Sequence, residues 1–286
     1  MMSDFENKMI DDFFQNMFMG TDGIYGALKQ SQEQSEEIAL REKVAEEASD
    51  DFMSDIANSH SIPVMDYEVN QILEKLPRNA VIVDVGGCWG WHWRKLNLIR
   101  PDVKVIIIDF VRANLLHAKT LLGDLINKSV YLVHGDATKL ELPDESVDCY
   151  WSVQALQHIP NYNKAIDEAF RVLKPGAEFN NYSLNNQWPI RKMYDLLGKN
   201  YVVKGQVNKS FFIERASKEQ RLYIEKVFSN KVAERWSEVL YKPELHIIAA
   251  GKEGSIFGFF DSRLSNSLGL FKSIARQRSY HCVKKL

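Results

Sequence analysis

Three aspartates stand at points where short apolar runs end: Asp84, Asp109 and Asp136. The carboxyl ends of parallel strands meet at one edge of a sheet, where ligands bind, so these side chains are expected to lie close together. Asp109 can accept hydrogen bonds from both hydroxyls of a ribose, and Asp136 can accept one from the amino group of an adenine. Phe110, next to Asp109, can cover the face of that base. Taken singly, each carboxylate could instead cap a helix or fill a solvated turn.

A glycine-rich turn follows the first of these runs. Gly86, Gly87 and Gly90 permit positive φ and a close approach of a ligand to the backbone. A helix beginning there would present unpaired N–H groups. Cys88 and Trp91 occupy the second and third glycine positions of the dinucleotide fingerprint, which would crowd a pyrophosphate. The turn therefore favours a different ligand.

The elements that must position these residues are short strands alternating with helices. β-branched and aromatic runs predict strands at 80–85, 103–109, 130–135, 147–153 and 178–183. Helices are expected near 91–98, 113–122 and 163–173, the last stopped by Pro175-Gly176. Nearly continuous apolar strands separated by single helices indicate a parallel sheet covered on both faces. The fold class is therefore α/β, a Rossmann-like doubly wound sheet.

The two ends of the chain follow a looser pattern. Residues 1–66 form an acidic extension in which one amphipathic helix is predicted from Ile38 to Ile56, with a shorter one around 10–18. This extension is interpreted as a helical cap packed on the main domain, or as a lid or dimer arm. Beyond Ser183, the capping box at Ser217–Gln220 predicts a helix to about Phe228. A further helix is expected near 233–240, and strands at 246–250 and 279–284.

Four segments carry a family resemblance: VDVGGCWGWHW, IIIDF, HGDATKLELPDESVDCYWSVQALQHIP and AFRVLKPG. In this order the chain resembles class I S-adenosylmethionine-dependent methyltransferases. The last two segments are closest to the branch that includes the ubiquinone/menaquinone-biosynthesis methyltransferases. The resemblance covers about residues 78–183 and implies a sheet of about seven strands whose last strand is antiparallel, with 279–284 as the candidate.

The resemblance also implies which residues hold S-adenosylmethionine. The methionine part falls to Asp84 and to the turn that contains Gly86, Gly87, Cys88 and Gly90. Asp109 takes the ribose, Asp136 and Ala137 the adenine, and Ser152 and Val153 border the sulfonium. Two departures stand out: Cys88 replaces the middle glycine of the turn, and the fifth strand, EFNNYS, is unusually polar.

Methyl transfer is an in-line displacement in which the protein mainly aligns the two reactants. A base is needed when the nucleophile is a hydroxyl, and His158 is the candidate because the resemblance places it next to the donor methyl. His158 could instead cap or pack beneath its loop. Cys88 as a nucleophile has little support beside a packed thiol. Trp89, Trp91 and Trp93 with His92 could line the cofactor entrance or bury the first helix.

Acceptor choice is expected outside the common core, so 67–286 is read as the methyltransferase domain with 185–245 as its substrate-binding insertion. Several basic and aromatic residues of this insertion suit a sugar, phosphate or aromatic acceptor: Trp188, Arg191, Lys192, Tyr194 and Lys204. The predicted reaction is methyl transfer to an oxygen of a small molecule or saccharide. RNA methylation and a catalytically silent cofactor-binding or assembly protein are the alternatives.

Composition sets the remaining limits. The 286 residues include 3 cysteines, too few for a disulfide framework or a four-thiolate zinc site, and the histidines lack metal-ligand spacing. No segment resembles a membrane span or a signal peptide, so a cytoplasmic location is expected. The net charge of −2 makes a nucleic-acid partner improbable. It combines an excess of ten acidic residues up to Ser59, which could pair a homodimer, with six uncompensated bases from Ser262 onward.

Overall fold

A computed structural model describes residues 10, 12–26, 35–47, 49, 51–199, 217–264 and 269–285. In these residues one sheet of seven strands has the order β3-β2-β1-β4-β5-β7-β6. The strands are β1 (Val81–Val85), β2 (Lys104–Asp109), β3 (Val130–His134), β4 (Val147–Val153), β5 (Leu173–Leu184), β6 (Ala233–Ser237) and β7 (Gln277–Val283). β7 is antiparallel to β5 and β6, whereas β1 to β5 pair in parallel. The predicted Rossmann-like fold with an antiparallel last strand is confirmed.

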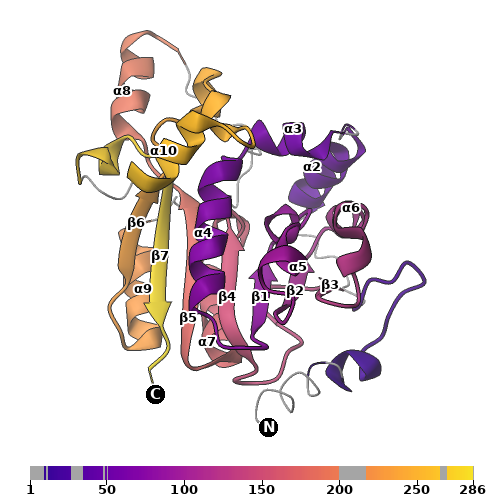
Figure 1. The fold of residues 1–286 in the computed structure, drawn as a ribbon. Coiled ribbons are helices and arrows are strands. Elements are labelled where there is room, and N and C mark those ends of the chain that lie inside the picture. The colour runs from indigo at the N-terminus through magenta and orange to yellow at the C-terminus, as the bar shows by residue number, and fades with distance from the viewer. Residues whose placement is uncertain are drawn as a thin grey trace.

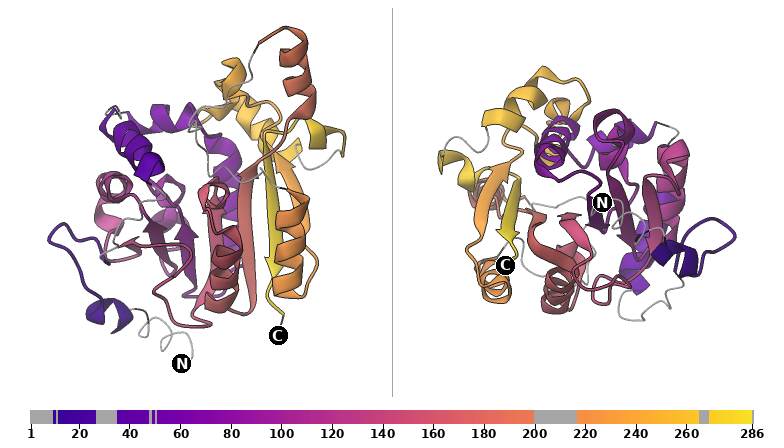
Figure 2. Two further views of the ribbon diagram at one scale, coloured as in Figure 1. Left: turned by 180° about the vertical axis from the view of Figure 1, so that it is seen from behind. Right: turned by 60° about the horizontal axis from the view of Figure 1, so that its bottom comes forward.

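Helices cover both faces of the sheet (Figures 1 and 2). On one face lie α3 (Phe52–Ala57), α4 (Ile62–Lys75), the short helices η2 (Trp91–Trp93) and α5 (Leu96–Ile99), and α6 (Arg112–Leu122). The other face carries α7 (Tyr162–Val172) and α9 (Lys218–Phe228), seen from behind in Figure 2. The remaining helices are α2 (Ser35–Glu46), η3 (Gly123–Leu125), η4 (Leu156–His158), α8 (Trp188–Leu196), η5 (Pro243–Leu245), η6 (Ala249–Gly251), α10 (Ile256–Leu264) and η7 (Gly269–Ser273).

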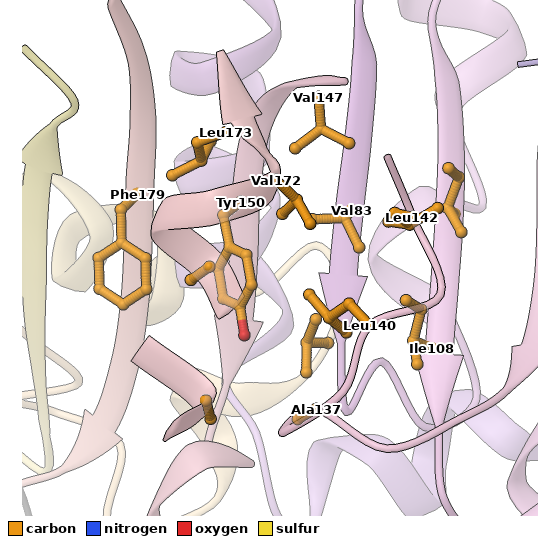
Figure 3. Packing of buried hydrophobic residues seen from close by; sticks show 14 of the residues in the cluster. Val83, Ile108, Ala137, Leu140, Leu142, Val147, Tyr150, Val172, Leu173 and Phe179 are labelled. Carbon is orange, nitrogen blue, oxygen red and sulfur yellow. The ribbon is translucent and has the colours of Figure 1, made fainter. Parts of the chain in front are cut away.

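The core against α7 and α9 is aromatic on its β5 side and aliphatic towards β2. Figure 3 shows Val83, Tyr150 and Phe179, from three neighbouring strands, pointing to the same side as Val172 at the end of α7. Tyr150 and Phe179 stack with their ring centroids 5.2 Å apart. Because every residue of β1 is buried, the sheet gives a fixed base for the turn that follows that strand.

The N-terminal segment protects an edge of the sheet. The Tyr25 N–H donates to the Leu132 carbonyl, and the His134 N–H donates to the Tyr25 carbonyl, each over 2.8 Å. Phe14 stacks on Tyr131 at a centroid separation of 4.3 Å. These contacts cover β3, whose outer edge would otherwise expose unpaired backbone groups.

The five central strands agree with the sequence prediction, and so do α6, α7, α9 and β7. The capping box is present: Ser217 accepts from the Gln220 N–H, and the Gln220 side chain accepts from the Ser217 N–H. Pro175 and Gly176 do not stop α7, which ends at Val172, but lie inside β5.

Four local predictions are wrong. The helix expected at 233–240 is strand β6, because pairing with β7 and the Glu234–Arg278 ion pair override the helical preference of these residues. No strand forms at 246–250, where Ile247 makes an isolated bridge to Lys242 and η6 begins at Ala249. The helix expected at 91–98 is split into η2 and α5. The single helix expected from 38 to 56 is split into α2 and α3, since Asp51 caps a new helix by accepting from the Ser54 N–H.

Candidate functional site

A cavity of about 480 Å³ opens at the carboxyl ends of the first four strands. Predicted cofactor residues from each strand end line it: Gly86, Gly87, Cys88, Asp109, Phe110, Asp136, Ala137 and Val153. The structure thus brings together side chains that are far apart in the sequence. Asp84, Gly90 and Ser152 are not among the lining residues.

The turn after β1 fits tightly over the sheet. Gly86 has φ of 70°, and a Cβ there would collide with the Cβ of Ala155. A Cβ at Gly87 would lie 2.6 Å from Asp84 Oδ2. Cys88 takes a left-handed conformation with φ of 51°, so the turn accommodates a side chain where the family has glycine. The turn consequently presents bare backbone to the cavity at Gly86 and Gly87.

Asp84 lies beneath this turn, fully buried. Its Oδ2 accepts a 2.7 Å hydrogen bond from Trp93 Nε1, and its Oδ1 has no partner among the described residues. Burial raises the pKa of Asp84 to about 7, with a smaller contribution from the charge of Asp109. An unpaired buried carboxylate oxygen is costly, so Oδ1 is an unsatisfied acceptor directly beneath the turn.

Asp109 holds two elements together at the cavity wall. Its Oδ2 accepts from the Cys88 N–H at 2.9 Å, and its Oδ1 accepts from the Val111 N–H at 2.8 Å. Burial raises the pKa of Asp109, while nearby Arg41 acts in the opposite direction. A carboxylate has about four lone-pair sites, so Asp109 keeps capacity for a ligand hydroxyl.

Asp136 and Ser152 both make hydrogen bonds that stabilise the local backbone. The two Asp136 oxygens accept from the backbone N–H and the hydroxyl of Thr138, at 2.8 and 2.9 Å. Asp136 therefore fills a turn as well as lining the cavity, and its contact with an adenine stays a prediction. Ser152 is buried and donates to the Val85 carbonyl at 2.8 Å, which joins the ends of β4 and β1.

His158 lines the cavity from η4. Gln157 Oε1 accepts from the Leu184 N–H, which turns the Gln157 amide nitrogen towards His158 Nε2 at 3.3 Å. The amide can only donate there, so this network assigns the acceptor role to Nε2. Burial lowers the pKa of His158 to about 3, with a smaller effect from Arg41, so the ring is neutral at pH 7.

The structure separates the tryptophans and His92 that line the cavity from those that do not, and it shows the state of the Cys88 thiol. Trp89, Trp91 and His92 line the cavity, whereas Trp93 is buried beside Asp84. Burial raises the pKa of the Cys88 thiol to about 12, helped by the charge of Asp109. Cys88 is thus a thiol rather than a thiolate, as expected for a packed cysteine.

Sequence reasoning missed the residues that close the cavity from the two ends of the chain. Arg41 of α2, His60, Pro243 and Arg276 all line it. The amphipathic pattern of α2 gave a signal for packing, but no local pattern shows which site a helix will cover. His60 and Arg276 come together only through the tertiary fold.

The basic C-terminal residues do not form one open patch. Arg276 is buried between Glu238 and Glu244, at 2.8 Å from each carboxylate. Arg278 pairs with Glu234, and Lys284 pairs with Glu145. In the described ranges these pairs neutralise half of the positive charge of the tail. Lys204, predicted as an acceptor contact, lies outside the described residues.

Neither a metal-ligand cluster nor a membrane-spanning helix is present in the described residues. They contain no cluster of three or more metal-ligating side chains. None of their helices is both long and apolar enough to pass through a membrane.

Comparison with known proteins confirms the family resemblance of the central segment. Residues 83–179 match the family model described as a methyltransferase domain. A ubiquinone/menaquinone biosynthesis C-methyltransferase of Methylobacterium nodulans is 33% identical over 99 residues, 34% of this chain and 39% of the relative. A malonyl-[acyl-carrier protein] O-methyltransferase of Buchnera aphidicola is 32% identical over 136 residues, 46% of this chain and 52% of the relative. The chain thus spans about half or less of these relatives.

Solved structures agree on the fold. A putative methyltransferase in complex with the Trm112 activator of Haloferax volcanii superposes with a TM-score of 0.54 at 17% identity, covering 86% of this chain and 98% of that one. A possible histamine N-methyltransferase of Thermotoga maritima gives a TM-score of 0.54 at 16% identity, covering 87% of this chain and 100% of that one.

Proposed function

We propose that this protein is an S-adenosylmethionine-dependent methyltransferase that methylates an oxygen of a small molecule or saccharide. The observation that carries the proposal is the convergence of the glycine turn, Asp109 and Asp136 on one cavity within the segment that matches the methyltransferase family. Ligands of open α/β sheets bind at this edge.

The residues present fit the cofactor. The unpartnered Oδ1 of Asp84 beneath the turn suits the ammonium group of its methionine part, directly or through water. Gly86 and Gly87 line the cavity, and the tight packing of this turn against Ala155 and Asp84 requires glycine at both positions. Asp109 would take a ribose hydroxyl, since Cys88, Val111 and Asn114 already donate to its carboxylate, and Phe110 and Asp136 would take the adenine. When bound, the cofactor supplies a methyl carbon activated by a positive sulfonium.

The acceptor side of the cavity is polar but carries unsatisfied groups. Several buried ring or amide nitrogens on lining residues have no partner among the described residues: His60 Nδ1, His92 Nδ1, His92 Nε2, Trp89 Nε1 and Gln154 Nε2. Burial lowers the pKa values of His60 and His92, so both rings are neutral. Neutral nitrogens that need partners can pair with a hydroxyl-bearing acceptor, and Arg41 and Arg276 line the same cavity.

His158 would accept the proton of the acceptor hydroxyl at Nε2 once the acceptor displaces the Gln157 amide, because this nitrogen has a single lone pair and Gln157 donates to it. Its low pKa keeps this nitrogen unprotonated at pH 7. The protein's other contribution is alignment and exclusion of water. A carbon nucleophile, as in the name of the Methylobacterium relative, would need no such base at oxygen.

We also propose that helices α2 and α3 of the extension 1–66 act as a lid on a methyltransferase domain formed by 67–286, with acceptor choice assigned to 185–245; residues 12–26 of the extension cover the edge of β3 instead. Arg41 supports the lid, since it lines the cavity and its charge affects the pKa values of Asp109, Cys88 and His158. Pro243 supports the insertion by lining the same cavity. Pairing of two chains through the acidic extension remains a second role for 1–66.

Transfer of a labelled methyl group tests the function. Small-molecule and glycan fractions of a cell extract are incubated with labelled S-adenosylmethionine and the protein. The proposal expects a labelled methyl ether or ester, absent with Asp109→Ala and reduced about 10²- to 10⁴-fold with His158→Gln. Label on carbon alone, or His158→Gln at full rate, would overturn the oxygen acceptor. No label in any fraction would overturn the activity.

A further inference from the structure

Helix α10 differs from an ordinary surface helix in that its large apolar residues are exposed and its buried residues are small or polar. Its buried residues are small or polar: Gly258, Asp261 and Ser262. Its large apolar residues face outwards, with exposed fractions of 64% for Ile256, 58% for Phe257, 49% for Phe259, 48% for Phe260 and 51% for Leu264. Single exposed apolar residues are common, but five on one short helix mark an interaction site.

Specific contacts fix this orientation. The Asp261 carboxylate accepts from the backbone N–H groups of Val239, Leu240 and Tyr241, at 2.8, 3.1 and 3.2 Å. A Cβ at Gly258 would lie 2.5 Å from both the Ala250 carbonyl and Pro63 Cγ, so this side of the helix fits closely against the body. The outward position of the phenylalanines is therefore built into the packing.

Helix α8 adds a second exposed apolar surface. None of its residues is buried, and Trp188, Met193, Leu196 and Leu197 are 58%, 45%, 80% and 62% exposed. Both α8 and α10 lie at the end of the molecule that also carries α2 and α3, in the two opposite views of Figures 1 and 2. We call the exposed apolar residues of 188–197 and 256–264 the apolar end face.

On and next to α8 and α10 the exposed bases outnumber the exposed acids, whereas the acidic helices α2 and α3 lie elsewhere on the same end of the molecule. Its exposed bases are Arg191, Lys192, Lys199, Lys252, Arg263 and Lys272. The guanidinium of Arg263 lies 3.8 Å from the centroid of the Phe259 ring, so charge and aromatic surface adjoin. Of the nearby acids, Asp261 is buried, and Glu253 pairs with Arg94 and Lys95. Asp195 is an exposed acid within the described part of α8.

We propose that the apolar end face docks this protein peripherally on an anionic lipid bilayer. Short helices that expose Trp, Phe and Leu beside Lys and Arg match the chemistry of the interface, where rings enter the headgroup layer and cations meet lipid phosphates. The positive face disfavours a symmetric second copy, because like charges would then oppose each other. This binding needs no cofactor and stands apart from methyl transfer.

Vesicle flotation tests the proposal with the full chain. The probes are vesicles of phosphatidylcholine alone and vesicles that also contain phosphatidylglycerol. We expect binding to the anionic vesicles that weakens with salt. The double variant Phe257→Ser/Phe260→Ser should lose at least about tenfold in partitioning, since each ring contributes buried apolar area. Leu98→Ser on α5, where Leu98 is 85% exposed, is the matched control and should bind as the wild type does.

Three results would overturn the proposal. The first is no binding of the wild type to anionic vesicles. The second is equal binding by the double variant, with circular dichroism showing that both proteins are folded. The third is a dimer in light scattering that the double variant dissociates, which would assign the apolar end face to contact between two copies. A variant that binds less while remaining folded and monomeric supports bilayer docking.

Discussion

The backbone N–H of Cys88 donates a 2.9 Å hydrogen bond to Oδ2 of Asp109, which joins the turn after β1 to the end of β2. The same carboxylate accepts from Val111 at the start of α6. Asp109 thus shapes the cavity wall before any ligand arrives, and its side chain has both a structural and a binding role.

Asp109→Ala should therefore reduce both stability and ligand affinity. Leaving the Cys88 and Val111 N–H groups without this acceptor is expected to cost about 1–3 kcal/mol in the free energy of unfolding. Urea unfolding measures that loss, and calorimetry with S-adenosylhomocysteine should show no binding by the folded variant. Asp124→Ala, an exposed carboxylate in η3, serves as the control. Unchanged affinity in Asp109→Ala would contradict the ribose role.

The Cys88→Gly variant should fold and should retain methyl transfer. Cys88 has φ of 51°, a conformation that glycine adopts without strain, so the free energy of unfolding should change by less than about 1 kcal/mol. Its raised thiol pKa of about 12 predicts slow alkylation by iodoacetamide at pH 8 in the folded protein. Loss of methyl transfer in folded Cys88→Gly would show that the thiol has a chemical role.

The Arg41→Gln variant tests whether the proposed lid contacts the bound cofactor. If Arg41 meets the carboxylate of the cofactor's methionine part, the variant should bind S-adenosylhomocysteine at least about tenfold more weakly, an effect expected for one charge-assisted hydrogen bond. Its affinity for 5′-methylthioadenosine, which lacks that carboxylate, should stay the same. Equal weakening for both ligands would contradict this pairing, and Lys43→Gln on the exposed side of α2 is the control.

His281 gives a pH prediction with a defined sign. Burial lowers its pKa to about 3, and its two ring nitrogens contact Asn180 Oδ1 and Ser279 Oγ at 2.7 and 2.8 Å. In the unfolded chain the pKa of His281 is about 6.5, so below this pH the unfolded chain binds a proton that the folded chain does not bind. The free energy of unfolding therefore falls as the pH falls. Between pH 7.5 and 5 this group should cost the wild type about 2 kcal/mol.

His281→Asn removes that group, so the stability advantage of the wild type over the variant should shrink by the same amount over this range. Urea unfolding at several pH values measures it. A difference that is independent of pH would contradict a neutral buried His281. Buried acids such as Glu68 and Glu238, whose pKa values burial raises, act in the opposite direction in both proteins and cancel in the comparison.

The central strands could be predicted from sequence because a strand that is buried on both faces consists almost entirely of apolar residues, as in 81–85 and 104–109. Segment 233–240 could not, since its residues favour a helix locally and become β6 only through pairing with β7. The candidate site also contains residues that could be predicted from sequence and residues that could not. Asp109 was found from its place at a strand end, but Arg41, His60 and Arg276 reach the cavity through contacts between distant parts of the chain.

Calorimetric titration with S-adenosylhomocysteine tests the central claim most directly. Gly86 lies at φ of 70° against Ala155, whereas a Cβ at Gly269 would meet open space. The proposed function predicts that the wild type and Gly269→Val bind the ligand alike and that folded Gly86→Val does not bind it. Absence of binding by the wild type, or equal binding by Gly86→Val, would contradict a cofactor site in this cavity.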